Sequence, residues 1–186
     1  MTEETGKKNI ESEWISNIRN GDKKSLEKLF FTYYAKLHRF ALRYLHDSMA
    51  ADDIIQDLIV KIWEDRETLS INYSLSAYLY SAVRNRAINH IRNTKARAIW
   101  EESDLSILTD NNPGPEEMMN KNEFNETVKK AIETLPGKCR LIFTMHIQDE
   151  LKYAEIAKIL EISENTISVQ MGRALKKIRD ILSRQQ

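Results

Sequence analysis

The chain has 186 residues, enough for one mid-sized domain or two small ones. Hydrophobic residues make up 41% and charged residues 30%, as in soluble globular proteins, which excludes a fully disordered chain. The single cysteine, Cys139, excludes an internal disulfide, and the histidines are too widely spaced for structural zinc. No apolar run approaches about 18 residues and the first ten residues are polar, so we expect a cytoplasmic protein without membrane insertion, metal or cofactor.

The zero net charge, 28 basic against 28 acidic residues, hides a segregation of charge along the chain. Residues 71–98 contain five basic residues and no acidic one, whereas residues 99–126 contain eight acidic residues and one lysine. The C-terminal stretch is basic again. Because the local charge decides binding to nucleic acid, the balanced total does not argue against such a partner.

The first informative helix is predicted over residues 51–64. Its apolar side carries Ile54, Ile55, Leu58 and Ile62. Its opposite side carries Asp53, Gln56, Asp57 and Val60. The preceding loop residues His46, Asp47 and Ser48 and the acidic first turn favour a helix start here, through capping and the helix dipole. The acidic residues are either a binding surface or only a solvated first turn.

A second helix is predicted over residues 76–97. Its apolar face comprises Leu79, Ala82, Val83, Ala87 and Ile91. Its opposite face offers Asn85, Asn89 and Arg92, with Arg84, Arg86 and Lys95 beside them. Tyrosines stand in the preceding loop (Tyr73) and in the helix (Tyr78 and Tyr80). Cations and amides among aromatic rings suit melted nucleic acid, because phosphates meet cations and unstacked bases meet rings. The alternative is a solvated basic helix whose tyrosines belong to the core.

The acidic segment after this helix has the composition of a linker. Residues 110–115, Asp-Asn-Asn-Pro-Gly-Pro, cannot continue a helix and offer nothing to pack. Helical periodicity without strand alternation precedes this segment from about Trp14, and further helical sequence follows it. The sequence therefore predicts an all-α chain with two small helical domains joined by an acidic flexible linker.

The C-terminal fifty residues predict a helix-turn-helix. Tyr153, Ile156, Ala157 and Leu160 form one short apolar stripe. After a turn at residues 161–163, with Ser163 as N-cap, a second stripe comprises Ile167, Met171, Leu175, Ile178 and Leu182. The exposed side of the last helix is basic and suits backbone phosphates, and a preceding helix at about 138–148 is needed to complete the core.

Three stretches in this order resemble the extracytoplasmic-function group of bacterial RNA polymerase sigma factors, in the sigma-70 family. Residues 51–64 resemble the core-polymerase-binding helix of that group, and residues 76–92 resemble its promoter-melting helix that reads the minus-10 element. Leu135-Pro136, the segment 153–157 and the segment 166–175 resemble its minus-35-binding domain. The resemblance covers the chain from about Lys23 to Leu182.

The resemblance implies a transcription initiation factor, not an enzyme, that binds core RNA polymerase, directs it to promoters and assists melting. Residues 1–98 would form a sigma-2-like helical bundle that binds core polymerase and the minus-10 element. Residues 99–118 would be the linker, and residues 119–186 a sigma-4-like helix-turn-helix domain for the minus-35 element. Its partners would be core polymerase, double-stranded and melted promoter DNA, and an anti-sigma factor.

The resemblance also carries over individual contacts. The residues expected to bind core polymerase are Asp53, Gln56, Asp57 and Trp63. The loop at residues 66–76 would hold a base flipped from the non-template strand, with Asn85 beneath it. The residues expected at the minus-10 element are Tyr73, Arg84, Asn85, Arg86, Asn89 and Arg92.

The residues that match minus-35 contacts are Thr166, Ser168, Val169, Gln170, Gly172, Arg173, Lys176 and Lys177. The chain departs from the commoner pattern at three positions. Ser168 replaces a basic residue and Gly172 a bulky one, so base readout is either thinner here or shifted toward Gln170, a side chain that can pair with an adenine edge. Glu161 replaces the usual turn glycine, at some cost in strain.

The acidic linker has two possible roles. Its carboxylates can mimic the charge of RNA and thread polymerase channels, or the segment only sets the reach between the domains.

Two other functions account for part of the sequence. A plain helix-turn-helix regulator would explain the C-terminal domain but leave the Asp53-Gln56-Asp57 face unused, and it would bind its operator without polymerase. An enzyme that holds magnesium through Asp52, Asp53 and Asp57 would need a second carboxylate cluster on a facing helix, and the sequence offers no convincing one.

Overall fold

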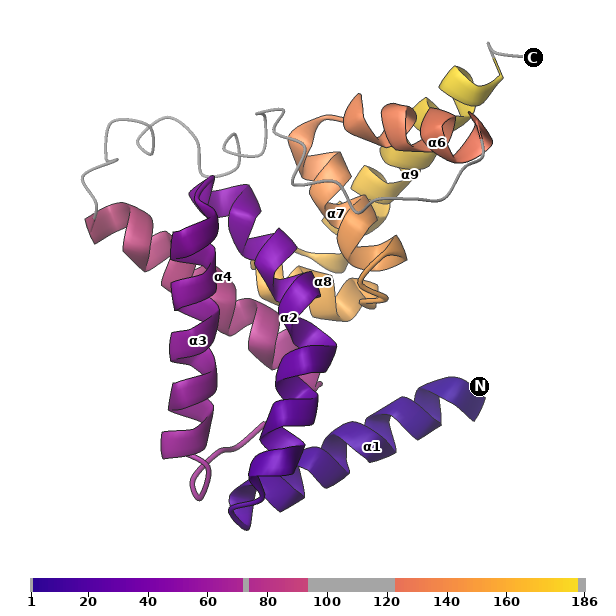
Figure 1. Ribbon diagram of the computed structural model, residues 1–186. Coiled ribbons are helices and arrows are strands. Elements are labelled where there is room, and N and C mark those ends of the chain that lie inside the picture. Colours follow the sequence, from indigo (N-terminus) through magenta and orange to yellow (C-terminus); the bar gives the residue numbers. More distant parts are fainter. Residues whose placement is uncertain (1, 72–73, 94–122, 184–186) are drawn as a thin grey trace. The chain divides into compact units, whose positions relative to one another are not determined.

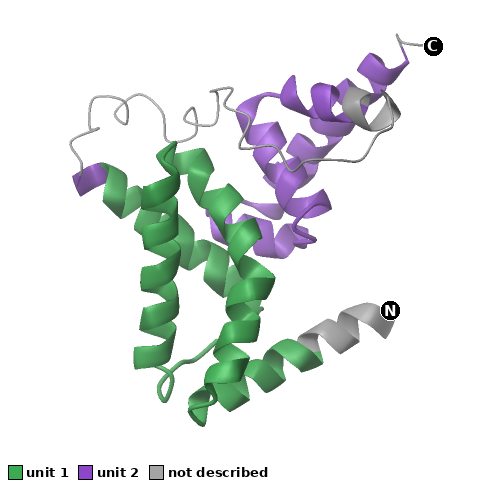
Figure 2. Ribbon diagram, in the orientation of Figure 1, with its two compact units in different colours: residues 1–91 green, residues 92–186 purple. Residues whose placement is uncertain are grey.

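The computed structural model of the chain describes residues 2–71, 74–93 and 123–183, and every regular element in these ranges is an α-helix (Figure 1). The predicted all-α class is therefore confirmed. The chain divides into two compact units, residues 1–91 and 92–186 (Figure 2). The predicted acidic linker at 99–118 and the predicted minus-10 contact Tyr73 lie outside the described residues. No described helix has both the length and the hydropathy needed to cross a bilayer.

Unit 1 is built from four helices. They are α1 (Thr2–Arg19), α2 (Lys23–Leu45), α3 (Ser48–Glu64) and α4 (Leu75–Asn93). α2 and α3 lie side by side as a hairpin, and α4 crosses both (Figure 1). α4 begins one residue before its predicted start, and the predicted last turn, residues 94–97, is outside the described residues. α1 begins well before Trp14, where helical periodicity first becomes evident in the sequence.

Side-chain caps determine where the helices of unit 1 begin. The Asp22 carboxylate accepts hydrogen bonds from the amides of Lys24 and Ser25, and Asp47 does the same for Met49 and Ala50. Of the three loop residues predicted to favour this helix start, Asp47 is the cap, and α3 begins at Ser48, three residues before its predicted start and without an acidic residue in its first turn. Ser74 Oγ accepts from the Ala77 amide at 3.1 Å, next to the start of α4. Between the helices, the buried core includes Leu29, Leu37, Phe40, Ile55, Leu58, Ile62, Leu79, Tyr80 and Val83.

Unit 2 contains the predicted helix-turn-helix. Its helices are α6 (Glu123–Glu133), α7 (Gly137–Ile147), α8 (Tyr153–Leu160) and α9 (Glu164–Leu182). α7 packs against both α8 and α9 and completes their core, as expected. Ser163 caps α9 by accepting from the Thr166 amide at 3.1 Å. Leu175, predicted in the buried stripe, is instead 47% exposed, and Ala174 takes its place between Met171 and Ile178.

The turn of the helix-turn-helix is closed by a residue in the left-handed conformation. Glu161 has φ 57° and ψ 41°, and the amide of Ile162 donates to the Ala157 carbonyl at 3.0 Å. This hydrogen bond belongs to a Schellman motif, in which glycine is the usual residue because a Cβ is strained at positive φ. Glu161, which replaces the usual turn glycine, therefore stands at a position whose backbone conformation favours glycine.

Replacing Glu161 with glycine is expected to raise the free energy of unfolding of unit 2 by about 1 kcal/mol, the scale of the left-handed penalty. Urea denaturation of the full chain, followed by helical circular dichroism, measures the change. Replacing the exposed Lys129 with glycine inside α6 is the matched control and should lower stability, because glycine is unfavourable in a helix interior. A lower midpoint for Glu161→Gly would contradict the expectation.

Candidate protein and nucleic-acid interfaces

The outer face of α3 is acidic and exposed. Asp53, Gln56 and Asp57 are all exposed at helical spacing, and Val60 continues the row one turn further on, 55% exposed. The opposite side of α3 is buried through Ile54, Ile55, Leu58 and Ile62, as predicted. Burial of that side holds the three polar side chains in a fixed outward direction. We refer to Asp53, Gln56, Asp57 and Val60 as the α3 outer face.

Asp52 does not belong to this face, although it is adjacent in sequence. It is half-buried and turned toward α2, where Tyr34 Oη donates to Asp52 Oδ1 at 2.5 Å and His38 Nε2 lies 3.3 Å from the same oxygen. The hydrogen bond to Asp52 raises the pKa of the Tyr34 hydroxyl. Asp52, Asp53 and Asp57 therefore do not converge on one point, and no described group of three His, Cys, Asp or Glu side chains could hold a metal ion.

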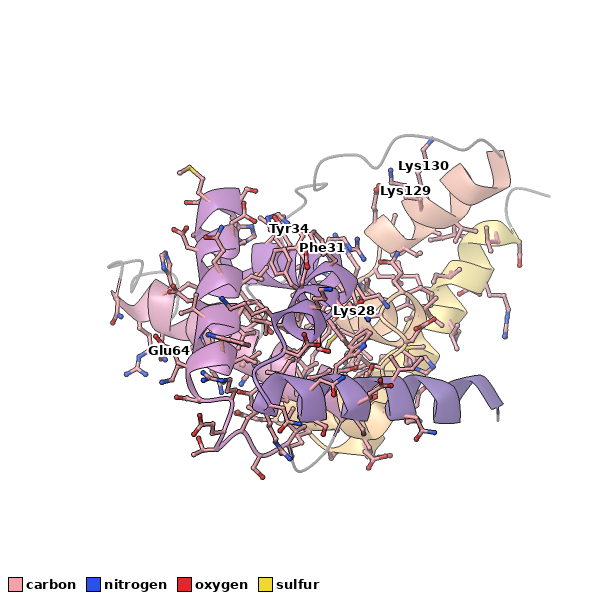
Figure 3. All side chains as sticks on the ribbon, turned by 60° about the horizontal axis from the view of Figure 1, so that its bottom comes forward. Lys28, Phe31, Tyr34, Glu64, Lys129 and Lys130 are labelled. Atoms are coloured by element: carbon pink, nitrogen blue, oxygen red, sulfur yellow. The ribbon has the colours of Figure 1, made fainter. Side chains whose placement is uncertain are left out.

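An apolar groove of about 490 Å³ lies between α2 and α3, beside the α3 outer face. Its lining residues are Lys23, Leu26, Glu27, Phe30, Phe31, Ile59, Val60 and Trp63. Phe31 projects from α2 and is 70% exposed (Figure 3). Val60 belongs to both surfaces. Trp63 lines the groove. It does not lie in one row with Asp53 and Asp57, although all three were predicted from the sequence as core-polymerase contacts.

Two cations hold Trp63 in place at the end of this groove. The Arg66 guanidinium lies 4.7 Å from the indole centroid and the Lys23 ammonium 5.9 Å from it. Arg66 also donates to the Trp63 carbonyl at 2.8 Å. An aromatic side chain fixed before binding loses little conformational freedom in a complex, so Trp63 suits the centre of a binding surface.

Sequence reasoning missed Phe30 and Phe31. The signal was present, because the buried positions of α2, at Leu29, Tyr33 and Leu37, recur every four residues. That spacing places Phe31 on the outward side of an amphipathic helix. An exposed phenylalanine beside two further aromatic residues forms an apolar patch, and such patches mark interaction sites.

On α4, Asn85, Asn89 and Arg92 are exposed and occupy one face at i, i+4 and i+7. Arg84 and Arg86 flank that face and are half-buried. Burial raises the pKa of the Tyr44 hydroxyl, and the Arg84 guanidinium beside it opposes the rise. Arg84 is therefore partly engaged within unit 1, whereas the two asparagines and Arg92 point to solvent.

The tyrosines of α4 belong mainly to the core, one of the two possibilities left open by the sequence. The Tyr80 ring is buried and meets Phe40 edge-on, with 4.9 Å between centroids. Tyr78 is half-buried. Tyr80 is therefore not a stacking surface for bases.

Most of the residues predicted as minus-35 contacts lie on the exposed side of α9. Ser168, Val169, Gly172, Arg173, Lys176 and Lys177 are exposed. Thr166 is half-buried, and its hydroxyl lies 2.9 Å from that of Ser163 in the cap. Lys177 Nζ donates to the Thr134 carbonyl at 2.5 Å, so part of its donor capacity is used inside the unit. A Cβ at Gly172 would meet nothing within 4 Å, so packing does not require glycine there.

Gln170 is held by the only cysteine of the chain. The buried Cys139 thiol on α7 donates to Gln170 Oε1, with 2.9 Å between sulfur and oxygen. Burial raises the pKa of Cys139, while Arg173 and Lys177 oppose the rise. The thiol thus keeps its proton at neutral pH and remains a donor. One lone pair of Gln170 Oε1 is thus engaged, whereas this hydrogen bond uses neither donor of the amide NH₂ group.

Two family models match the chain: Sigma-70 region 2 at residues 29–97 and Sigma-70, region 4 at residues 125–178, together about two thirds of its length. Curated relatives include the ECF RNA polymerase sigma factor SigW of Bacillus subtilis, 25% identical over 173 residues, which are 89% of this chain and 92% of that protein. The ECF RNA polymerase sigma-E factor of Escherichia coli is 25% identical over 174 residues, covering 88% of this chain and 90% of that protein.

Solved structures of the same fold include CnrH in complex with the cytosolic domain of CnrY, with TM-score 0.58 and 15% identity, covering 95% of this chain and 99% of that one. The sigma factor RpoE in complex with the anti-sigma factor NepR, from Bartonella quintana, also gives TM-score 0.58, with 19% identity over 86% of this chain and 98% of that one. Two regions of one family therefore match in order, and full-length relatives are sigma factors. The chain belongs to the sigma-70 family, in its extracytoplasmic-function group, and is a bacterial transcription initiation sigma factor.

Proposed function

We propose that this sigma factor docks on core RNA polymerase through the α3 outer face and the apolar groove beside it. Asp53, Gln56 and Asp57 offer carboxylates and an amide to a basic surface, which steers association and fixes register. Val60, Trp63 and the exposed Phe31 offer apolar area next to those charges. An apolar centre with a polar rim is the usual composition of a specific protein interface.

The exposed face of α4 is proposed to hold the melted minus-10 strand. Asn85, Asn89 and Arg92 supply amides for base edges and a cation for phosphate. Arg84 and Arg86 add positive charge on the flanks of that face. Tyr73 remains part of the proposal from the family resemblance alone.

α9 is proposed to enter the major groove of the minus-35 element. Arg173, Lys176 and Lys177 suit phosphates, whereas Ser168, Val169 and Gln170 suit base edges. Because Gln170 Oε1 already accepts from Cys139, its NH₂ group is proposed to make the base contact, which favours an acceptor such as guanine O6 or N7, or thymine O4. This modifies the adenine pairing expected from the sequence.

The proposal includes regulation by an anti-sigma factor. One solved structure of this fold is the sigma factor RpoE in complex with the anti-sigma factor NepR, and another is CnrH in complex with the cytosolic domain of CnrY. The protein would act without enzymatic activity in the cytoplasm, where polymerase and chromosome meet. Residues 1–98 would serve core binding and the minus-10 element, and residues 119–186 the minus-35 element, with the acidic segment 99–118 as the linker between them.

The observation that carries the proposal is that separate units expose an acidic and apolar surface on α3 and a basic surface on α9. Run-off transcription with purified core polymerase on fragmented genomic DNA tests it directly. Discrete transcript starts that appear only when the protein is added are the expected result. Aligned upstream sequences would then give both promoter elements.

A plain helix-turn-helix regulator predicts the opposite outcome. Such a protein would bind DNA by itself and give core polymerase no new start sites. That result would contradict the proposed binding of core polymerase by α3 and of the minus-10 strand by α4. Only the proposed DNA-binding face of α9 would remain.

A further inference from the structure

Arg66 makes two different contacts with Trp63. Its guanidinium lies 4.7 Å from the centroid of the indole ring, and its Nη1 donates to the Trp63 backbone carbonyl at 2.8 Å. Lys23, at the start of α2, adds a second cation 5.9 Å from the same centroid. Trp63 and Arg66 are both half-buried, which strengthens the attraction between cation and ring relative to a fully exposed pair. The indole therefore has a preferred orientation in the free protein.

The turn that carries Arg66 is itself fixed to the rest of unit 1. The Asp65 carbonyl accepts hydrogen bonds from the amide and the hydroxyl of Thr68, at 3.0 and 3.1 Å, directly after the end of α3. The Leu69 side chain is buried, and its carbonyl accepts from Nε and Nη2 of Arg19 on α1, at 3.1 and 2.5 Å. Hydrogen bonds from a charged guanidinium are stronger than neutral ones, so two of them on one carbonyl restrain the backbone at this point. Arg66 thus lies in a segment that is held on both sides.

We infer that Arg66 is a positioning residue for the binding of core polymerase, because it sets the indole of Trp63 in the orientation that contacts the partner. The inference rests on the proposed function, in which the apolar groove between α2 and α3 docks on core polymerase. Trp63 lines that groove together with Phe31 and Val60, so its orientation decides the shape of the apolar surface. Arg19, which anchors the turn, lies outside the matched Sigma-70 region 2, which begins at residue 29.

The physical reason is preorganisation. A tryptophan that samples several rotamers in the free protein loses that freedom when it is buried at an interface, and the loss weakens binding. A tryptophan already held in one orientation loses less. Aromatic anchors at the centre of an interface contribute most of its affinity, so the orientation of Trp63 matters more than that of a side chain at the rim.

A purely structural role for Arg66 makes a different prediction. Its hydrogen bond to the Trp63 carbonyl caps the last turn of α3, and its ion pair with the exposed Glu67 spans 3.7 Å. Neither contact involves the indole. The substitution Trp63→Ala removes the indole and keeps the backbone carbonyl. A double-mutant cycle between positions 63 and 66 therefore separates the two roles.

The test measures the Kd of the labelled full chain for purified core polymerase by fluorescence anisotropy. The chains compared are the wild type, Arg66→Ala, Trp63→Ala and the double variant. We expect a loss of about fivefold for Arg66→Ala and of at least about tenfold for Trp63→Ala. In the Trp63→Ala background, Arg66→Ala should change the Kd by less than about twofold. Arg66→Lys should bind more tightly than Arg66→Ala, because a lysine ammonium can still lie over the indole.

A second measurement follows the indole in the free protein. The chain contains three tryptophans, so replacing Trp14 and Trp100 with phenylalanine leaves Trp63 as the only fluorescent indole. The decay of its fluorescence anisotropy over nanoseconds reports the motion of the ring. Arg66→Ala should increase the amplitude of this fast motion, whereas the helical circular dichroism should stay that of the wild type.

The matched control is Lys61→Ala, which also removes one cation near the end of α3. Lys61 is exposed, pairs with Asp65 at 3.0 Å and is not among the residues that line the groove. Its effect on the Kd should be the same with and without the indole, and the motion of Trp63 should not change.

The outcomes separate the inference from the proposed function. An equal loss for Arg66→Ala in both backgrounds, no loss at all, or unchanged motion of the indole would overturn the inference and leave the groove as the docking surface. If Trp63→Ala bound core polymerase as tightly as the wild type, the proposed docking through the groove would be wrong, and the inference would fall with it.

Discussion

Replacing Val60 with aspartate is expected to weaken the binding of the protein to core RNA polymerase by at least about tenfold, or 1.4 kcal/mol. Val60 stands where the α3 outer face meets the apolar groove, and a carboxylate there would be desolvated without a partner in the complex. In the free protein the side chain is 55% exposed, so stability should change by no more than about 0.5 kcal/mol. Fluorescence anisotropy with labelled protein and purified core measures the affinity.

The matched control for Val60→Asp is Ile147→Asp. Ile147 is 54% exposed at the end of α7, in unit 2, and belongs to none of the three proposed interfaces. It should bind core polymerase like the wild type. Equal affinity for the wild type and Val60→Asp, with both folded by circular dichroism, would show that core polymerase does not use the groove.

Replacing both Arg173 and Lys176 with alanine is expected to reduce the affinity of holoenzyme for promoter DNA by roughly 100-fold at low salt. Each lost phosphate contact also lowers the dependence of log K on log salt by about 0.9, so the slope should fall by about 1.8. Lys177 is left unchanged in this variant because it donates to the Thr134 carbonyl, and its loss would disturb the unit itself. Titration of a minus-35-containing promoter at several salt concentrations gives both quantities.

The control for this double variant removes the same charge from the same unit. Lys129 and Lys130 are exposed on α6 (Figure 3), and their replacement by alanine should leave the salt slope nearly unchanged. Equal losses in the two double variants would mean that the overall positive charge of unit 2, and not the face of α9, attracts DNA.

The helices and their ends follow closely from the sequence, because the interactions that form them are local. Ser163 was predicted as a cap and Asp47 as one of three capping residues, and both accept amide hydrogen bonds within the next three residues. The buried side of α3 also matches its apolar stripe. Leu175 was misassigned because the spacing alone allows either Ala174 or Leu175 inside, and the packing of α9 against its neighbours selected the smaller residue.

The surfaces are less predictable, because their geometry depends on residues that are distant in the chain. Asp52 has the same side-chain chemistry as Asp53, yet its contacts with Tyr34 and His38 remove it from the outer face. Trp63 was predicted from the sequence as a core-polymerase contact, but its place in a groove depends on α2, which supplies Phe30 and Phe31.

The sequence by itself determined the helical class, the helix-turn-helix, the acidic and basic faces and the sigma-factor family, since periodicity, capping and motif order are all encoded within short stretches. Only the tertiary structure decided that Arg19 restrains Leu69, that Cys139 holds Gln170 and that the α3 outer face borders an apolar groove. Arg19 and Leu69 are 50 residues apart in the chain, and Cys139 and Gln170 are 31 apart. No local pattern specifies such pairs, because they form only when packing of the helices brings their side chains together.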